Sequence, residues 1–246
     1  MLGKIFKKVN SYIRSKTGVY YHAVMSNPVE NIISSSNYAF LNSQDFQKYY
    51  DLACNTVGRD FNFPFRIHQA LWCASLSLHG DFVELGTGKG FTAGALAPYC
   101  LDNNFKGRIF LCDTFLPYKT NQFTGQQNSE SKKSIFYADA FEDVEKKFNK
   151  YEFVHFVKGS IPNSLTELPN DLKISFLHVD LNYYAAEISG LDFLWGNLSS
   201  GAVILLDDYA NFGRDKQRYE FDKFFAEKGL SILTTGSGQG IVVVCK

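Results

Sequence analysis

Four short apolar segments of this 246-residue chain each end at a carboxylate side chain. The segments are DFVE, RIFLCD, ISFLHVD and AVILLDD, and they end at Glu84, Asp113, Asp180 and the pair Asp207–Asp208. Apolar runs of this length, alternating with helical patterns, are typical of buried strands in a parallel α/β sheet. Such sheets bind ligands at the carboxyl ends of their strands, so we expect the acids to surround one crevice. Because like charges repel, the arrangement favours a polyhydroxy cofactor and a metal ion.

The residues from Gly80 onward alternate between strand and helix patterns, which predicts the framework that positions these acids. Strands are expected at 81–85, 108–113, 153–158, 174–180, 202–207, 230–235 and 240–245, and helices at 91–101, 135–149, 163–168, 184–198 and 215–228. The glycine-rich turn 236–240 predicts a hairpin, which reverses the last strand. The expected fold is α/β, with a Rossmann-like, mostly parallel seven-stranded sheet that contains one antiparallel strand.

Residues 1–65 have a different pattern and are interpreted as an N-terminal helical extension to a domain of residues 66–246. Residues 43–57 and 66–78 show helical spacing. Residues 1–16 predict a basic amphipathic helix, whose apolar positions are Leu2, Ile5, Phe6, Val9 and Ile13. We favour packing of this helix against its own domain or a second subunit, as in a homo-oligomer, over attachment to an anionic membrane.

Composition excludes several functional classes. The 25 basic and 25 acidic residues balance, so there is no electrostatic footprint for nucleic acid. No apolar run approaches the ~20 residues that span a bilayer. The five scattered cysteines favour reduced thiols over a disulfide framework or a zinc site. A cytoplasmic protein acting on a small molecule is the expectation.

The turn after the first predicted strand reads Glu84-Leu-Gly86-Thr87-Gly88-Lys-Gly90. Glycines there allow close approach to a ligand and leave backbone amides available to bind it. A phosphate-binding P-loop does not fit, because Val83 and Gly90 occupy two of its required positions. A dinucleotide site can be aligned from Gly88 through Ala93, with Asp113 toward a ribose. The pattern acid-x-Gly-x-Gly-x-Gly fits from Glu84 to Gly90 without adjustment, and it resembles class I S-adenosylmethionine-dependent methyltransferases.

Later segments resemble the macrocin O-methyltransferase family. They are Cys112-Asp-Thr-Phe-Leu-Pro117, Val154-His-Phe-Val-Lys-Gly-Ser160, His178-Val-Asp-Leu181, Leu198-Ser-Ser-Gly201 and Leu206-Asp-Asp-Tyr209. The resemblance covers about residues 80–246. It implies a magnesium-dependent O-methyltransferase that acts on a hydroxylated small molecule, often a sugar. It departs from the family at His178-Val179, where the family usually has Asp-Gly, and at Asn182, which displaces a tyrosine.

The resemblance also assigns roles to residues. It implies that Asp180, Asp207 and Asp208 bind the metal and that Asp180 lies nearest the reacting hydroxyl as the catalytic residue. The cofactor-binding residues that it implies are Glu84, Gly86, Thr87, Gly88, Gly90, Asp113, Thr114, Phe115, Gly159 and Ser160. The segment Thr114–Lys133 is long and polar and begins at the cofactor motif, so we expect a lid.

The expected chemistry agrees with these roles. An alcohol barely ionises at neutral pH, and a divalent cation held by carboxylates would acidify it and align it with a methyl donor. Oxygen ligands favour magnesium over zinc or copper. His178 should share a strand face with Asp180, either as a satisfied core residue, which we favour, or as a proton acceptor. The alternatives are a nucleotide-cofactor oxidoreductase on the same fold and a non-catalytic scaffold in glycan assembly.

Overall fold

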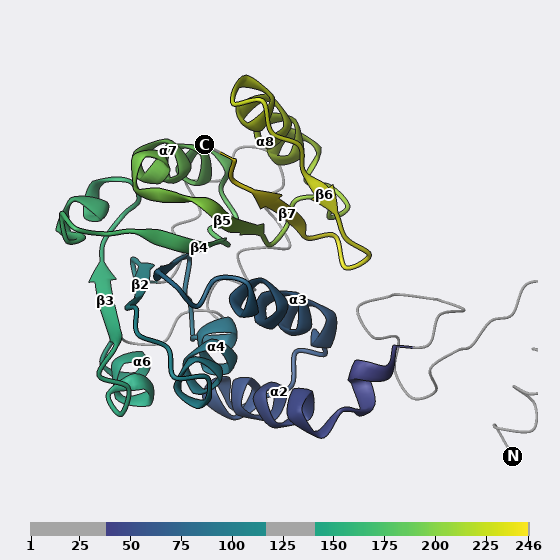
Figure 1. Cartoon of the computed structure of the whole chain (residues 1–246), viewed down its shortest axis with the longest axis vertical. Helices are drawn as coiled ribbons and strands as arrows, with labels where there is room; N and C mark the ends of the chain where they lie inside the picture. The colour runs from purple at the N-terminus through teal and green to yellow at the C-terminus, as the bar shows by residue number, and fades with distance from the viewer. Residues whose placement is uncertain (1–37, 117–140, 246) are drawn as a thin grey trace, which may run out of the picture.

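The computed structural model describes residues 38–116 and 141–245 and contains a seven-stranded sheet covered by helices on both faces (Figure 1). Its strand order is β3-β2-β1-β4-β5-β7-β6. The strands are β1 (Asp81–Leu85), β2 (Ile109–Asp113), β3 (Val154–Lys158), β4 (Ile174–Val179), β5 (Leu198–Leu206), β6 (Leu233–Thr234) and β7 (Gly240–Val243). Strands β1 to β5 pair in parallel, and β7 pairs antiparallel with both β5 and β6. The predicted sheet with one reversed strand is therefore confirmed.

The helices form one layer on each face of the sheet (Figure 1). One layer contains α2 (Gln44–Val57), α3 (Pro64–Ser75), α4 (Phe91–Asp102) and α6 (Phe141–Phe148). The opposite layer contains η4 (Asn163–Glu167), α7 (Tyr184–Leu194), η5 (Trp195–Asn197) and α8 (Asp215–Glu227). A short 3₁₀ turn, η2 (Ala39–Asn42), precedes α2. Burial of both sheet faces explains why the strand sequences are continuous apolar runs.

Alternation along the strands decides which acids face which layer. In β1, Phe82 packs into the α2–α3–α4 layer, whereas Val83 and Leu85 pack into the α7–α8 layer. Because side chains alternate between faces, Glu84 points to the same face as Phe82. By the same rule His178 in β4 follows Phe176 onto the α3–α4 face. The side chains of Glu84 and His178 therefore lie on the face of the sheet that α3 and α4 cover.

Helix α2 packs very closely on α4. Ala53 is fully buried between them, and a Cβ atom added to Gly94 would lie 2.6 Å from Thr56 Oγ1. The absence of a side chain at Gly94 lets the two helices approach. Residues 44–57, which fall within the predicted extension 1–65, therefore share the core on the α4 face of the sheet, and the division at residue 65 stays a proposal.

Several element boundaries differ from the predictions. The helix expected at 66–78 runs from Pro64 to Ser75, because proline suits the first turn of a helix. The helix expected at 184–198 ends at Leu194, and β5 begins at Leu198 rather than 202, because Leu198 pairs with Ile174 of β4. Strand β6 spans only Leu233–Thr234 instead of 230–235, since it is an edge strand that pairs with β7 alone.

Three predictions fall wholly or partly outside the described residues: the helix at 1–16, the segment 117–133 of the expected lid, and the start of the helix at 135–149. Of the five cysteines, those at 73, 100 and 112 are buried, whereas Cys54 is half-buried and Cys245 is exposed. Within residues 38–116 and 141–245, no helix has both the length and the apolar character needed to cross a bilayer.

Candidate active site

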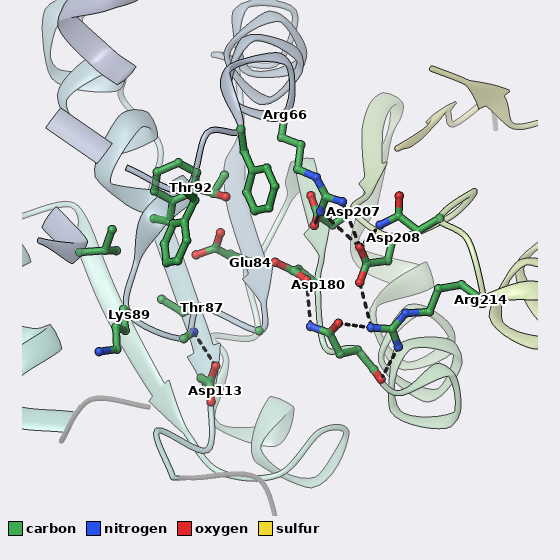
Figure 2. A pocket seen from close by; sticks show the side chains of 18 of the residues that line it. Arg66, Glu84, Thr87, Lys89, Thr92, Asp113, Asp180, Asp207, Asp208 and Arg214 are labelled. Atoms are coloured by element: carbon green, nitrogen blue, oxygen red, sulfur yellow. Dashed lines mark hydrogen bonds and ion pairs between the residues drawn. The ribbon is translucent and has the colours of Figure 1, made fainter. Parts of the chain in front are cut away.

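A cavity of about 390 Å³ opens at the carboxyl ends of β1, β2, β4 and β5 (Figure 2). All of the acids singled out by the strand pattern line it, namely Glu84, Asp113, Asp180, Asp207 and Asp208. The predicted crevice is therefore present. Its volume lies within the range of roughly 300–1,000 Å³ that is usual for small-molecule sites.

The glycine-rich turn lines the cavity with Gly86, Thr87 and Gly88. Gly86 has φ +95°, and a Cβ atom there would lie 2.0 Å from the carbonyl oxygen of Asp180. Only glycine allows this approach. The backbone N–H of Asp180 donates to Leu85 O at 2.8 Å, so the turn and the end of β4 are held together.

Asp113 is oriented by the same turn. Its Oδ2 accepts a hydrogen bond of 2.7 Å from the Gly88 N–H, and its Oδ1 accepts one of 2.8 Å from the Phe115 N–H. Figure 2 shows the carboxylate beside Thr87, apart from the acids of β4 and β5. Oδ1 also accepts from Thr114 Oγ1 at 3.3 Å, whereas Oδ2 keeps a second lone pair with which Asp113 can accept a hydrogen bond from a ligand hydroxyl.

Five of the residues that the resemblance implies for the cofactor do not line this cavity: Gly90, Thr114, Phe115, Gly159 and Ser160. Phe115 is buried in the core against Phe141. The Gly159 N–H donates to Asp113 O at 2.9 Å. Gly159 therefore contacts the cavity residue Asp113 through its backbone.

Glu84 and His178 form a buried pair on neighbouring strands. They are register partners in β1 and β4, and Glu84 Oε1 lies 3.0 Å from His178 Nδ1. Burial alone would lower the pKa of His178, but Asp207 and Glu84 outweigh it and raise that pKa to about 10. No described residue offers a hydrogen-bond partner to His178 Nε2 or Glu84 Oε2. The histidine is thus buried, as favoured from the sequence, but only one of its nitrogens is satisfied.

Asp207 is surrounded by donors. Its Oδ1 accepts from Gln239 Nε2 at 2.7 Å and lies 3.7 Å from His178 Nε2, and its Oδ2 accepts from Arg66. Burial would raise the pKa of Asp207, but the charges of Arg66 and His178 outweigh it and lower that pKa to about 2. Asp207 is therefore ionised.

Asp208 is held by two arginines from opposite sides (Figure 2). Arg66 lies 3.2 Å from Oδ1, and Arg214 lies 3.3 Å from Oδ2. Asn211 also donates to Oδ1. Burial, followed by the charge of Asp207, raises the pKa of Asp208.

Asp180 receives fewer hydrogen bonds than Asp207 and Asp208, within the described residues. The single hydrogen bond to its side chain comes, within the described residues, from Asn182 Nδ2 at 3.4 Å. Burial and the charges of Asp207 and Asp208 raise its pKa well above the usual range. Asn182 in turn accepts from Arg214 at 2.6 Å, so the residue that departs from the family pattern links Asp180 to Arg214.

This donor set fits a cation. Ligating atoms of His178, Asp180 and Asp207 all lie within 4.8 Å of one another. Burial is the largest cause of the raised pKa of Asp180, and repulsion by the carboxylates of Asp207 and Asp208 adds to it. The buried Nε2 of His178, which lacks a hydrogen-bond partner among the described residues, faces the same group. A divalent ion would relieve the repulsion among the carboxylates.

Sequence reasoning missed the basic and amide partners of these acids. Arg66 comes from α3, Arg214 precedes α8 and Gln239 precedes β7, so no local pattern connects them to the acids. It also missed Glu187 of α7, which accepts from the Leu181 N–H at 3.2 Å. Burial, assisted by the charge of Asp208, raises the pKa of Glu187 to about 8.

An aromatic wall closes another side of the cavity. Phe61 and Phe63 come from the connector between α2 and α3, and Phe91 begins α4. The rings of Phe61 and Phe91 meet edge to face with centroids 5.1 Å apart. Apolar rings beside a charged site limit its access to water.

Several solved structures with the same fold are methyltransferases. The O-methyltransferase NovP superposes with a TM-score of 0.69 at 17% identity, over 82% of this chain and 98% of its own. CalS11, a calicheamicin methyltransferase, gives 0.56 at 16% identity, over 89% of this chain and 97% of its own. TomG from Streptomyces achromogenes, solved with S-adenosylmethionine, gives 0.54 at 12% identity, over 97% and 96%. At these identities the likeness establishes the fold.

The family assignment comes from the sequence itself. None of the curated proteins compared matches the chain. The family model for macrocin O-methyltransferase matches residues 69–232, which include every acid of the cavity. This match favours the predicted methyltransferase over the oxidoreductase alternative. The chain thus belongs to the macrocin O-methyltransferase family.

Proposed function

We propose that the protein transfers a methyl group from S-adenosylmethionine to a hydroxyl of a small polar acceptor, with assistance from magnesium. One observation carries the proposal. A single cavity contains both the glycine-rich turn with Asp113 and the group Asp180, Asp207 and Asp208. A cofactor on the first side and an acceptor on the second would lie next to each other, which is what direct group transfer requires.

The cofactor would be held by Glu84, by the turn that contains Gly86 and Gly88, and by Asp113. Asp113 is suited to ribose hydroxyls because two backbone N–H groups already fix its carboxylate. A carboxylate that is already held in place loses little conformational freedom when it accepts hydrogen bonds from a ligand. Titration calorimetry with S-adenosylhomocysteine and with NAD tests this assignment. Binding of NAD without binding of S-adenosylhomocysteine would overturn it.

Asp180, Asp207 and Asp208 would hold magnesium, which when bound would lower the pKa of an acceptor hydroxyl and orient it. Among these ligands, Asp180 is the catalytic residue in our proposal, because its carboxylate has the fewest donors among the described residues and lines the cavity. An acceptor hydroxyl beside it would find an oxygen able to accept its proton.

Other residues shape the reaction site. Phe61, Phe63 and Phe91 would exclude water from the methyl-transfer path. Arg214 keeps Asn182 against Asp180 and so orients the catalytic carboxylate. Gln239 does the same for Asp207.

The acceptor class that we propose is a sugar or a sugar-containing metabolite. Among structures of this fold, CalS11 is described as a TDP-rhamnose 3'-O-methyltransferase. In this chain the cavity wall combines Asn182, Asn211 and Arg214 with phenylalanines, a mixture suited to the polar edges and apolar faces of a sugar ring.

Screening of free sugars and nucleotide-sugars for methyl transfer, followed by mass spectrometry, tests the acceptor class. Each positive acceptor would then be assayed with magnesium and with excess EDTA. Methylation of non-sugar alcohols alone would refute the sugar proposal. Full turnover in EDTA would refute the metal proposal and leave the cofactor assignment standing.

A further inference from the structure

Arg66 connects helix α3 to the acidic side of the cavity. Its guanidinium pairs with Asp207, and its two terminal nitrogens lie 3.3 and 3.2 Å from Asp208 Oδ1. Figure 2 shows the side chain reaching across the cavity wall to both acids. The Arg66 side chain is 16% exposed, so water screens these ion pairs only in part.

Both oxygens of Asp207 and Oδ1 of Asp208 accept hydrogen bonds from nitrogen donors, and Oδ2 of Asp208 forms an ion pair with Arg214. Gln239, Arg214 and Asn211 each approach one of the two acids. Arg66 alone, among the described residues, contacts both. A guanidinium that bridges two carboxylates and a divalent cation that bridges them require the same oxygen lone pairs.

We propose that Arg66 and the divalent cation are alternative partners of Asp207 and Asp208, and that Arg66 thereby sets the affinity of the site for metal. The inference rests on the metal-assisted function proposed above. In the metal-free protein Arg66 offsets one of the two negative charges of the acid pair. When the cation binds, its charge replaces that of the guanidinium and Arg66 must withdraw.

The structure provides Arg66 with a second partner. Its guanidinium carbon lies 5.0 Å from the centroid of the Phe63 ring, within the range of cation–π attraction. Phe63 belongs to the aromatic wall of the cavity and immediately precedes α3. Arg66 lies in the first turn of that helix. A displaced Arg66 side chain therefore keeps a favourable contact without movement of the helix.

Manganese binding to the full-length protein tests the proposal without an activity assay. Free Mn²⁺ is measured by electron paramagnetic resonance during titration of the wild type, Arg66→Gln and Arg66→Lys. Removing the competing charge should tighten Mn²⁺ binding by about tenfold or more in Arg66→Gln, equivalent to 1.4 kcal/mol. Arg66→Lys should give an intermediate affinity, because lysine keeps the charge but cannot bridge two carboxylates with a planar fork.

Arg218→Gln is the matched control. Arg218 lies on α8, is 57% exposed, pairs with Asp222 at 3.7 Å and does not line the cavity. Its loss should leave Mn²⁺ affinity at the wild-type value.

Equal or weaker Mn²⁺ binding by Arg66→Gln would overturn the inference while leaving the metal site intact. Absence of Mn²⁺ binding to every variant would refute the metal part of the proposed function, and this inference with it. If Arg66→Gln does not fold, Arg66→Lys decides the question, because it must still bind Mn²⁺ more tightly than the wild type.

Discussion

Replacing Gly86 by alanine should destabilise the protein and disrupt its cavity together. The new Cβ atom would lie 2.0 Å from Asp180 O, 2.5 Å from Asp180 C and 3.1 Å from Leu181 N. All three are backbone atoms, so no side-chain rotation can relieve the overlap. Either the turn or the end of β4 must move, and the hydrogen bond from Asp180 N–H to Leu85 O lies at that junction.

The cost has two parts. An alanine forced to positive φ costs about 1–2 kcal/mol. Overpacking against fixed atoms adds about 1–3 kcal/mol. We therefore expect Gly86→Ala to lower the free energy of unfolding by about 2–5 kcal/mol and to weaken the binding of S-adenosylhomocysteine, because Gly86 and Asp180 both line the cavity.

Gly229→Ala separates the two parts. Gly229 has φ +69°, and an added Cβ atom there would have no neighbour within 4 Å. It should show the backbone cost alone and keep wild-type affinity for S-adenosylhomocysteine. Urea denaturation and calorimetry of both variants provide the measurements. If Gly86→Ala loses no more stability than Gly229→Ala, close packing of the turn on β4 does not constrain this residue and the reasoning is wrong.

Three further predictions concern individual carboxylates. Asp113→Ala should weaken S-adenosylhomocysteine binding by ~1.5–3 kcal/mol, the scale of hydrogen bonds to a charged group, and calorimetry that detects no loss would contradict the ribose assignment. Asp207→Asn should raise the metal concentration needed for half-maximal activity, and an unchanged metal dependence in the acceptor assay would argue against Asp207 as a ligand. Asp81→Asn should lower the free energy of unfolding at pH 7 by about 1.5–3 kcal/mol, because Asp81 accepts from Arg108 Nη2 at 2.8 Å and from the Arg108 N–H at 2.9 Å. Burial would raise the pKa of Asp81, but Arg108 outweighs it and lowers that pKa, so this stability is present above pH ~4 and is lost as the pH falls through the folded-state pKa. The difference between the wild type and Asp81→Asn in urea denaturation should accordingly shrink in acid, whereas Asp171→Asn, at the exposed partner of Arg108, should have little effect at any pH.

The sheet and its row of acids could be predicted because both are local properties of the sequence. Each strand is a short apolar run, and the parallel arrangement places the residues that follow such runs at one edge. The two-residue alternation also placed His178 on the face of Asp180. The arginines that pair with these acids could not be predicted from local patterns, because Arg66 and Asp207 are 141 residues apart in the chain.

Some predicted boundaries of helices and strands were wrong for a related reason. The start of β5 at Leu198 depends on pairing with Ile174, and the length of β6 depends on having only β7 beside it. The cofactor roles of Phe115 and Gly159 stay predictions from motif position, and the burial of Phe115 and the bond from Gly159 to Asp113 depend on tertiary packing. Pairing and packing of this kind are set by neighbours distant in sequence.

The connector between α2 and α3 has a consequence for how enzymes of this type can diversify. Its two ends are anchored, because α2 is locked against α4 and α3 is buried in the same core. Between them, residues 58–63 contribute Phe61 and Phe63 to the cavity wall, and Arg66 follows within the first turn of α3. All of these positions precede residue 69, where the match to the family begins. An exchange of these six residues between fixed attachment points can thus replace one wall of the cavity while the glycine-rich turn and the acids are retained, which makes this connector a target for changing which small molecules the cavity admits.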